Sequence, residues 1–260
     1  MLGAIIGDIV GSPYEFANIH TTRFPLFSER SSFTDDTICT IAIADALVSG
    51  SDFGSKLREW GRRYPNPMGG YGGTFAAWLR SDNPQPYNSW GNGAAMRVSP
   101  VAWAFGEEDV VLRAALASAG CTHNHMEGLI GASVVALAIF RLRDMGYPSF
   151  QSARILNLLY PSYGLDWEKG LPLRGEFDET CRGCVPLAFS ICCRASSFED
   201  AIRRAVLYGG DSDTLAAIVG SLAEARWGIP VDISRKALSM LPDEMVVVID
   251  EFSKTFNYEV

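Results

Sequence analysis

The chain has 260 residues, of which 48% are hydrophobic and 20% are charged. This length fits one large domain or two small ones, and the apolar content allows a sizeable buried core. The net charge of −8 disfavours a nucleic-acid backbone as the main partner, because such a partner attracts a basic surface. A small phosphorylated ligand held by backbone N–H groups stays compatible with this charge.

The N-terminal segment argues against export of the chain. Residues Met1–Asp8 carry no positive charge before their apolar run, and Asp8 interrupts that run, so the segment does not read as a signal peptide. The best candidate for a membrane span, Leu129–Phe140, has only the length of a buried helix. We expect a cytoplasmic protein without a membrane partner, acting as a monomer.

Apolar residues at helical spacing dominate the chain, and strand signals are nearly absent. The β-prone run Met245–Ile249 lies inside an i, i+3, i+4 pattern. In chain order we expect helices over Leu2–Val10, Asp35–Val48, a segment capped by Ser51 or Asp52 and ending at Arg62, Thr74–Leu79, Met96–Phe105, Asp109–Ala119, Met126–Met145, Phe150–Leu159, Glu179–Arg194, Ser197–Leu207, Asp213–Trp227, Asp232–Leu241 and Glu244–Thr255. This pattern predicts an all-α protein, with a single domain over residues 1–260.

Two stretches, Tyr64–Gly73 and Ser81–Gly93, are too rich in glycine, proline and asparagine for regular structure. Long loops in a compact helical domain are usually functional or disordered. Glycine lets a ligand approach the backbone and leaves N–H groups free to bind anions. Both loops are therefore candidate binding elements.

Two acidic clusters stand at predicted helix starts far apart in the sequence, one within Phe33–Thr37 and one within Gly209–Thr214. Helix capping explains one aspartate at such a place, because a carboxylate accepts hydrogen bonds from free N–H groups. It explains two neighbouring carboxylates poorly, because they repel each other unless a cation lies between them. Hard divalent cations prefer oxygen ligands of this kind. The spacing alone leaves metal binding and capping as even alternatives.

The cysteines offer a second, weaker metal hypothesis. Cys181 and Cys184, followed by Cys192 and Cys193, provide four thiols. The segment between the pairs reads as apolar helix, on which two adjacent cysteines point about 100° apart. We therefore favour small, reduced, buried side chains over a zinc site.

Six short blocks occur in one order along nearly the whole chain, and together they are specific although each alone is weak. The blocks are Gly3–Glu15, Phe33–Thr37, Gly70–Thr74, Gly91–Val98, Thr122–His123 and Gly209–Thr214. In this order they resemble the ADP-ribosylglycohydrolase family, which includes the dinitrogenase reductase-activating glycohydrolases.

The resemblance implies an all-α orthogonal multi-helix bundle with two Mg²⁺ ions, or Mn²⁺, in a central cleft. The ions would hold the ribose hydroxyls of an ADP-ribosyl group beside the scissile bond. Asp213 would bridge the two ions. The implied metal ligands are Thr34, Asp35, Asp36, Asp211, Asp213 and Thr214.

Two carboxylates compete for the catalytic role that the resemblance implies. Glu15 matches a family position implicated in metal contact and catalysis, and a carboxylate near the anomeric carbon suits an oxocarbenium-like transition state. Its alternative is a solvated loop residue. Asp35 competes as the base, because other branches of the family are described with a metal-bound aspartate in that role.

The glycine-rich loops and His123 supply the implied substrate contacts, although a structural role for His123 is an even alternative. Trp90 can stack on adenine or pack as a surface aromatic. For Arg97 we favour a structural ion pair over a phosphate contact. His125 departs from the family pattern and is unassigned. The implied substrate-binding residues are Gly72, Gly73, Ser89, Trp90, Gly91, Asn92 and His123.

The predicted function is hydrolysis of the glycosidic bond between ADP-ribose and an acceptor, such as a modified Arg or Ser side chain of a protein. One alternative is a hydrolase of a small molecule such as O-acetyl-ADP-ribose or a nucleoside adduct. Another is a non-catalytic binder of ADP-ribose. The four aspartates of the two clusters argue against the last alternative.

Overall fold

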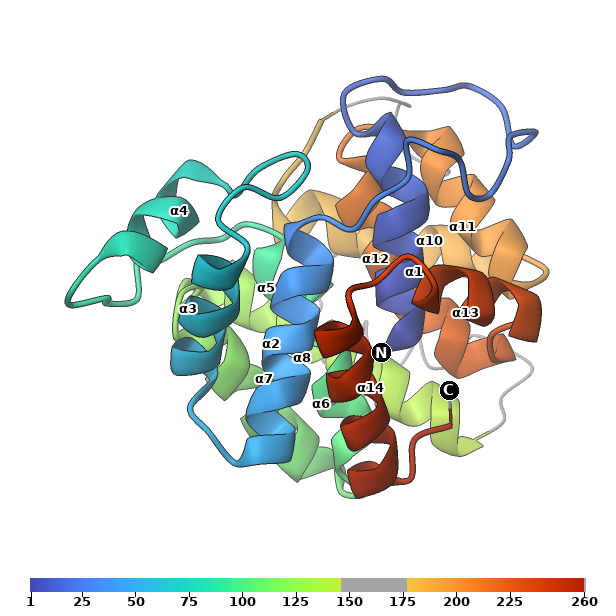
Figure 1. Cartoon of the computed structure of the whole chain (residues 1–260). Coiled ribbons are helices and arrows are strands. Elements are labelled where there is room, and N and C mark those ends of the chain that lie inside the picture. The colour runs from blue at the N-terminus through green and yellow to red at the C-terminus, as the bar shows by residue number, and fades with distance from the viewer. Residues whose placement is uncertain (146–176, 260) are drawn as a thin grey trace.

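The computed structural model describes residues 1–145 and 177–259, and this part of the chain consists of helices and loops without a β-strand (Figure 1). The helices are α1 (Leu2–Gly11), the 3₁₀ turn η1 (Ser12–Tyr14), α2 (Asp35–Ser49), α3 (Phe53–Arg63), α4 (Gly73–Arg80), α5 (Gly93–Met96), α6 (Ser99–Ala104), α7 (Glu108–Gly120), α8 (Met126–Met145), α10 (Cys181–Arg194), α11 (Phe198–Tyr208), α12 (Ser212–Trp227), α13 (Val231–Leu238) and α14 (Asp243–Phe256). The all-α prediction is confirmed for the described residues. Among these helices, none combines the length and the apolar run that crossing a bilayer requires.

Helices α1 and α12 pack antiparallel with their backbones in contact. The glycines Gly3, Gly7 and Gly11 recur every four residues and so share one face of α1. A Cβ atom added at Gly7 would lie 2.0 Å from the carbonyl oxygen of Ala216, and one at Gly11 would lie 2.5 Å from that of Ser212. Only glycine fits at these positions, and the close approach places the end of α1 beside the start of α12.

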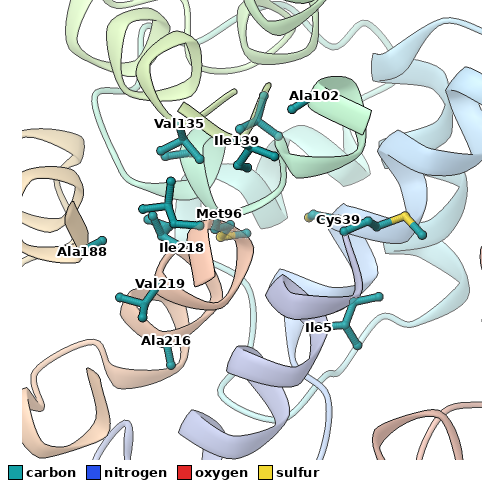
Figure 2. Packing of buried hydrophobic residues seen from close by; sticks show 14 of the residues in the cluster. Ile5, Cys39, Met96, Ala102, Val135, Ile139, Ala188, Ala216, Ile218 and Val219 are labelled. Carbon is teal, nitrogen blue, oxygen red and sulfur yellow. The ribbon is translucent and has the colours of Figure 1, made fainter. Parts of the chain in front are cut away.

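The buried apolar side chains of several helices meet around this pair (Figure 2). In the close view, Ile218 of α12 lies near Val135 of α8. Burial of such side chains contributes roughly 1.5–3 kcal/mol each. The packed core therefore holds the ends of α1, α2 and α12 in place, and the polar residues of the site lie at these ends.

The predicted helix Met96–Phe105 is wrong as a single element, because the structure has two short helices, α5 and α6, in its place. Pro100 lies in the first turn of α6. Proline has no N–H to donate to the carbonyl of Met96, and its ring would clash with that carbonyl in a continuous helix.

Most other helix ends lie within one or two residues of the prediction, although α13 ends at Leu238 instead of Leu241. Asp52, one of the two expected caps, accepts a hydrogen bond from the Ser55 N–H at 2.8 Å at the start of α3. The predicted helix Phe150–Leu159 lies outside the described residues.

The cysteines are free thiols, in agreement with the reduced interpretation. Cys181, Cys184 and Cys192 are buried, and burial raises the pKa of each thiol. Within residues 1–145 and 177–259, the side-chain clusters that can hold a metal contain carboxylates and no cysteine. The structure gives the zinc hypothesis no support there.

Candidate metal centre and substrate cavity

Three helix ends bring the acidic residues together. The turn after α1 carries Glu15, while α2 and α12 begin at the two acidic clusters. Asn18 ties two of these ends to each other: its side-chain amide donates to the carbonyl of Glu15 at 3.1 Å and accepts from the Gly210 N–H at 2.6 Å. Gly209 and Gly210 adopt positive φ angles of 72° and 76°, which glycine tolerates best. The local backbone therefore holds Glu15 against the start of α12.

The carboxylates form two overlapping groups. One comprises Asp8, Asp36 and Asp213, and the other comprises Glu15, Asp211 and Asp213. Within each group the oxygens lie within 4.8 Å of one another. Asp213 belongs to both groups, which is the position a residue bridging two ions would occupy.

The structure adds Asp8, which the sequence analysis did not identify as part of the site. Its carboxylate accepts from the Thr34 N–H at 2.9 Å, from the Thr34 hydroxyl at 2.7 Å and from the Thr37 N–H at 3.1 Å, and also from the Thr37 hydroxyl. Asp8 thus binds the N-terminus of α2 from the neighbouring helix. The available signal was a lone aspartate in the apolar run of α1, which we used only to exclude a signal peptide.

Capping explains part of the first cluster. Thr34 is the N-cap of α2 and its hydroxyl oxygen accepts from the Asp36 N–H at 3.3 Å. Asp211, at the corresponding position of α12, makes no side-chain cap and accepts instead from the Asn92 amide at 2.6 Å. Helix capping therefore accounts for Thr34 and leaves the aspartates of the second cluster without that explanation.

Buried carboxylate oxygens in the site lack hydrogen-bond partners. Asp36 Oδ2 accepts from the Thr214 hydroxyl at 3.0 Å, but within residues 1–145 and 177–259 no donor reaches Asp36 Oδ1 or Asp213 Oδ1. Leaving a buried charged group unsatisfied is costly, and a hard divalent cation is the partner that such oxygens prefer. The residues present therefore fit a divalent metal ion.

The pKa values agree with this electrostatic imbalance. Burial raises the pKa of Asp8 to about 6 and, together with neighbouring carboxylates, raises that of Glu15 to about 7. Burial and repulsion also hold the pKa values of Asp35, Asp36 and Asp213 well above the usual range for aspartate. Each ionised carboxylate thus destabilises its neighbours unless a cation or a proton compensates its charge.

A cavity of about 440 Å³ opens beside the carboxylates. Its volume is within the usual range for small-molecule sites. The expected site residues that line it are Glu15, Asp35, Asp36, Gly72, Gly73, Ser89, Gly91, Asn92, His123, Asp211, Asp213 and Thr214.

Two expected site residues, Thr34 and Trp90, are not part of the cavity wall. Thr34 is fully buried with its hydroxyl turned to Asp8. Trp90 is 56% exposed and its ring packs edge-on against His125, with 5.7 Å between ring centroids. Lining residues that the sequence did not indicate include Phe16, Tyr87, Phe177 and Glu179.

The expectation of an ion pair for Arg97 is wrong. Within the described chain this 1%-exposed guanidinium donates to the Ser118 carbonyl at 3.2 Å and to the Thr122 hydroxyl at 2.7 Å, with no carboxylate partner. The Thr122 hydroxyl in turn lies 2.7 Å from His123 Nδ1. Burial, reinforced by the charge of Arg97, lowers the pKa of His123 well below its ordinary value.

The neutral His123 ring is held in one orientation. Since the Thr122 oxygen accepts from Arg97, its own proton can be donated to Nδ1, and we infer that the ring proton is on Nε2. A Cβ atom added at Gly93 would lie 3.0 Å from Nε2, so this nitrogen faces the turn at residues 91–93. His123 can therefore donate a hydrogen bond into the cavity.

Comparisons with known proteins agree with this architecture. The family model described as ADP-ribosylglycohydrolase matches residues 1–257. An uncharacterized protein of Archaeoglobus fulgidus is 26% identical over 268 residues, covering 87% of this chain and 86% of the relative. ADP-ribosylhydrolase ARH3 of Mus musculus is 28% identical over 172 residues, which cover 54% of this chain and 46% of the mouse protein.

A solved structure has the same fold. The chain named "ADP-ribosylglycohydrolase-related protein complex" superposes with a TM-score of 0.71 at 24% identity, covering 98% of this chain and 96% of that one. At this identity the likeness concerns the fold alone. On the family model, which spans nearly the whole sequence, the chain belongs to the ADP-ribosylglycohydrolase family.

Proposed function

We propose that the protein hydrolyses the glycosidic bond between ADP-ribose and an acceptor group, using two divalent ions, Mg²⁺ or Mn²⁺. The observation that carries this proposal is the pair of buried oxygens of Asp36 and Asp213 at the wall of one cavity, which have no hydrogen-bond partner in the described part of the chain. The overlap of the two carboxylate groups at Asp213 supports two ions with one bridging ligand. Family membership supports a glycohydrolase in general.

The metal ligands we propose are the oxygens of both acidic clusters together with Glu15. When bound, the ions orient ribose hydroxyls and offset the negative charge of the site. Thr34 keeps its expected place among the ligands only if its hydroxyl turns from Asp8. Asp8 is better suited to positioning the start of α2 than to binding an ion directly, because it already accepts four hydrogen bonds from Thr34 and Thr37.

The loops present polar groups to the remainder of the substrate. A Cβ atom added at Gly72 or Gly73 would meet nothing within 4 Å, so a ligand can approach this backbone directly. Asn92 and Ser89 line the same wall, and we assign them with Gly91 to the diphosphate. His123 donates from Nε2 to an oxygen of the substrate.

Hydrolysis breaks the bond between the anomeric carbon and the acceptor and joins that carbon to the oxygen of water. Glu15 is half-buried and lines the cavity, so its carboxylate can take the proton that the attacking water loses. The same negative charge stabilises an oxocarbenium-like transition state. Asp35 also lines the cavity and is the second candidate for this base.

The test is a panel of ADP-ribosylated Arg, Ser, nucleoside and acetyl compounds, assayed for release of ADP-ribose with Mg²⁺ and with EDTA. We expect turnover of at least one compound with Mg²⁺ and none with EDTA. Turnover that EDTA leaves intact would refute the metal-dependent proposal. Binding of ADP-ribose without any turnover would assign the chain to the non-catalytic alternative.

Two variants separate the roles of the candidate bases. Loss of the base removes most of kcat, while Mg²⁺ binding, measured by calorimetry, is weakened but kept, because an amide oxygen stays in the place of the carboxylate. We expect this result for Glu15→Gln. If Asp35→Asn shows it instead, and Glu15→Gln keeps its kcat, Asp35 is the base.

A further inference from the structure

An exposed pair of aromatic rings lines the cavity. Phe16 is 76% exposed and Phe177 is 48% exposed, although both are large apolar side chains. Their rings are stacked, with centroids 6.1 Å apart and planes 18° apart. Both belong to the wall that also contains Glu15. The pair is thus held in place without being buried, and its ring faces can meet a ligand.

The chain anchors both rings beside the reacting groups. Phe16 directly follows Glu15, which Asn18 fixes against the start of α12. Phe177 precedes Glu179, whose carbonyl accepts from the Asn92 N–H at 2.7 Å. The pair therefore lies next to the carboxylate that we place at the scissile bond.

A second ring pair lines the same cavity. Tyr87 and His123 lie with centroids 5.9 Å apart, and His123 belongs to the buried Thr122 network. An ADP-ribosyl group contains only one aromatic base, so one pair remains for another planar group. The leaving group is the part of the substrate bonded at the anomeric carbon. The pair adjoining Glu15 is accordingly the one that this group meets.

Glu179 gives the same corner a negative charge. Its carboxylate lines the cavity, belongs to neither metal-capable group and has no cation partner within the described residues. A carboxylate accepts hydrogen bonds from N–H groups, and aromatic faces attract planar or cationic groups. The combination fits a flat group that carries N–H donors.

We propose that Phe16, Phe177 and Glu179 form the leaving-group subsite, which selects a planar, N–H-bearing group over a small aliphatic alcohol. A guanidine and an amino-substituted nucleobase both have this chemistry. This inference rests on the proposed hydrolysis of ADP-ribosyl bonds. The three residues determine which leaving group is accepted, and none of them takes part in bond cleavage.

The test compares Phe16→Leu, Phe177→Leu and Glu179→Gln with the unmodified protein on three substrates. In these, ADP-ribose is linked to a guanidine, to an amino-substituted nucleobase or to serine. We expect kcat/KM for at least one planar substrate to fall about tenfold in each variant, the size of one lost stacking or charged contact. The kcat/KM for the serine-linked substrate and the Kd of free ADP-ribose change less than about twofold. Val247→Ala removes an exposed apolar group remote from the cavity wall and serves as the control.

The outcomes separate this inference from the proposed function. Equal losses on all three substrates, or weaker binding of free ADP-ribose, would overturn the subsite, because the rings would then hold adenine. If no substrate is turned over, the proposed function fails, and calorimetry with methylguanidine or cytosine in the presence of ADP-ribose still tests the subsite. Binding of one probe that Phe16→Leu weakens about tenfold supports the subsite, and binding of neither probe refutes it.

Discussion

Replacing Asp213 by asparagine is expected to make the metal-free protein more stable while removing its response to metal. Asp213 is buried and shares its surroundings with Asp36 and Asp211, and no donor among the described residues reaches its Oδ1. Burial and the charge of Asp211 raise its pKa well above the ordinary value. Asparagine keeps the shape of the side chain and removes the charge. The substitution thus weakens cation binding and raises the stability of the metal-free fold.

The magnitude follows from the cost of an unsatisfied buried group. Removing one such group contributes about 1–3 kcal/mol of stability. For a chain of this size, that corresponds to an increase in Tm of about 2–12 °C. The folded-state pKa lies above the unfolded one, so ionisation of Asp213 lowers stability as pH rises through the folded pKa. The gain is therefore present at pH 8 and disappears as the pH falls below the unfolded aspartate pKa of about 3.9, where both states carry the proton.

Thermal unfolding at pH 8, with EDTA and with Mg²⁺, measures both effects. The wild-type protein gains about 2.7 kcal/mol when Mg²⁺ is at 100 times its Kd, and Asp213→Asn gains nothing. Asp45→Asn is the control, because Asp45 is paired with Lys56 at 3.0 Å and accepts from the Trp60 indole at 2.8 Å, so its loss destabilises. A lower Tm of Asp213→Asn in EDTA, or a full response of this variant to Mg²⁺, would refute the reasoning.

Three further outcomes are expected. Gly7→Ala forces α1 away from α12, lowers the stability by about 1–3 kcal/mol or more and weakens Mg²⁺ binding. In the control Gly120→Ala the new Cβ would meet nothing within 4 Å, so Tm and Mg²⁺ affinity stay unchanged or rise slightly. Equal melting curves for both variants would contradict the packing argument. The Mg²⁺-induced rise in Tm is larger at pH 8 than at pH 5. The reason is that protonation of the proposed ligand Glu15 and of the neighbouring Asp8, with pKa values of about 7 and about 6, opposes cation binding as pH falls. A pH-independent rise would count against binding of the ion beside these two carboxylates. Nitrogen-15 NMR at pH 6 finds His123 neutral with its proton on Nε2, and a charged ring would contradict the buried network.

The sequence predicted well the features that depend on neighbouring residues, such as the positions of the helices. The apolar spacing of α2 and α8 predicted both helices closely, because each buries an apolar surface along its length. The aspartates at the starts of α2 and α12 were predicted as site residues because two carboxylates so close in sequence are hard to explain without a cation. The Met96–Phe105 segment failed because its apolar pattern outweighed Pro100, whose missing N–H ends the hydrogen-bond ladder.

Residues whose role depends on contacts between distant elements were not predicted. Asp8 is 26 residues from Thr34, and its place at the start of α2 follows from how α1 packs. Phe16 and Phe177 stack across more than half the chain, so neither residue alone carries a signal. Trp90 has the sequence position of a site residue, yet its indole packs on His125 outside the cavity wall.

A diffraction experiment on crystals soaked with Mn²⁺ tests most directly whether the carboxylates hold metal. The account predicts anomalous difference peaks within coordination distance of Asp213, with Asp36 on one side and Asp211 and Glu15 on the other. Crystals of Asp213→Asn treated in the same way would lose at least one of these peaks. Saturating Mn²⁺ with no peak at the cavity, or peaks held only by other residues, would contradict the account.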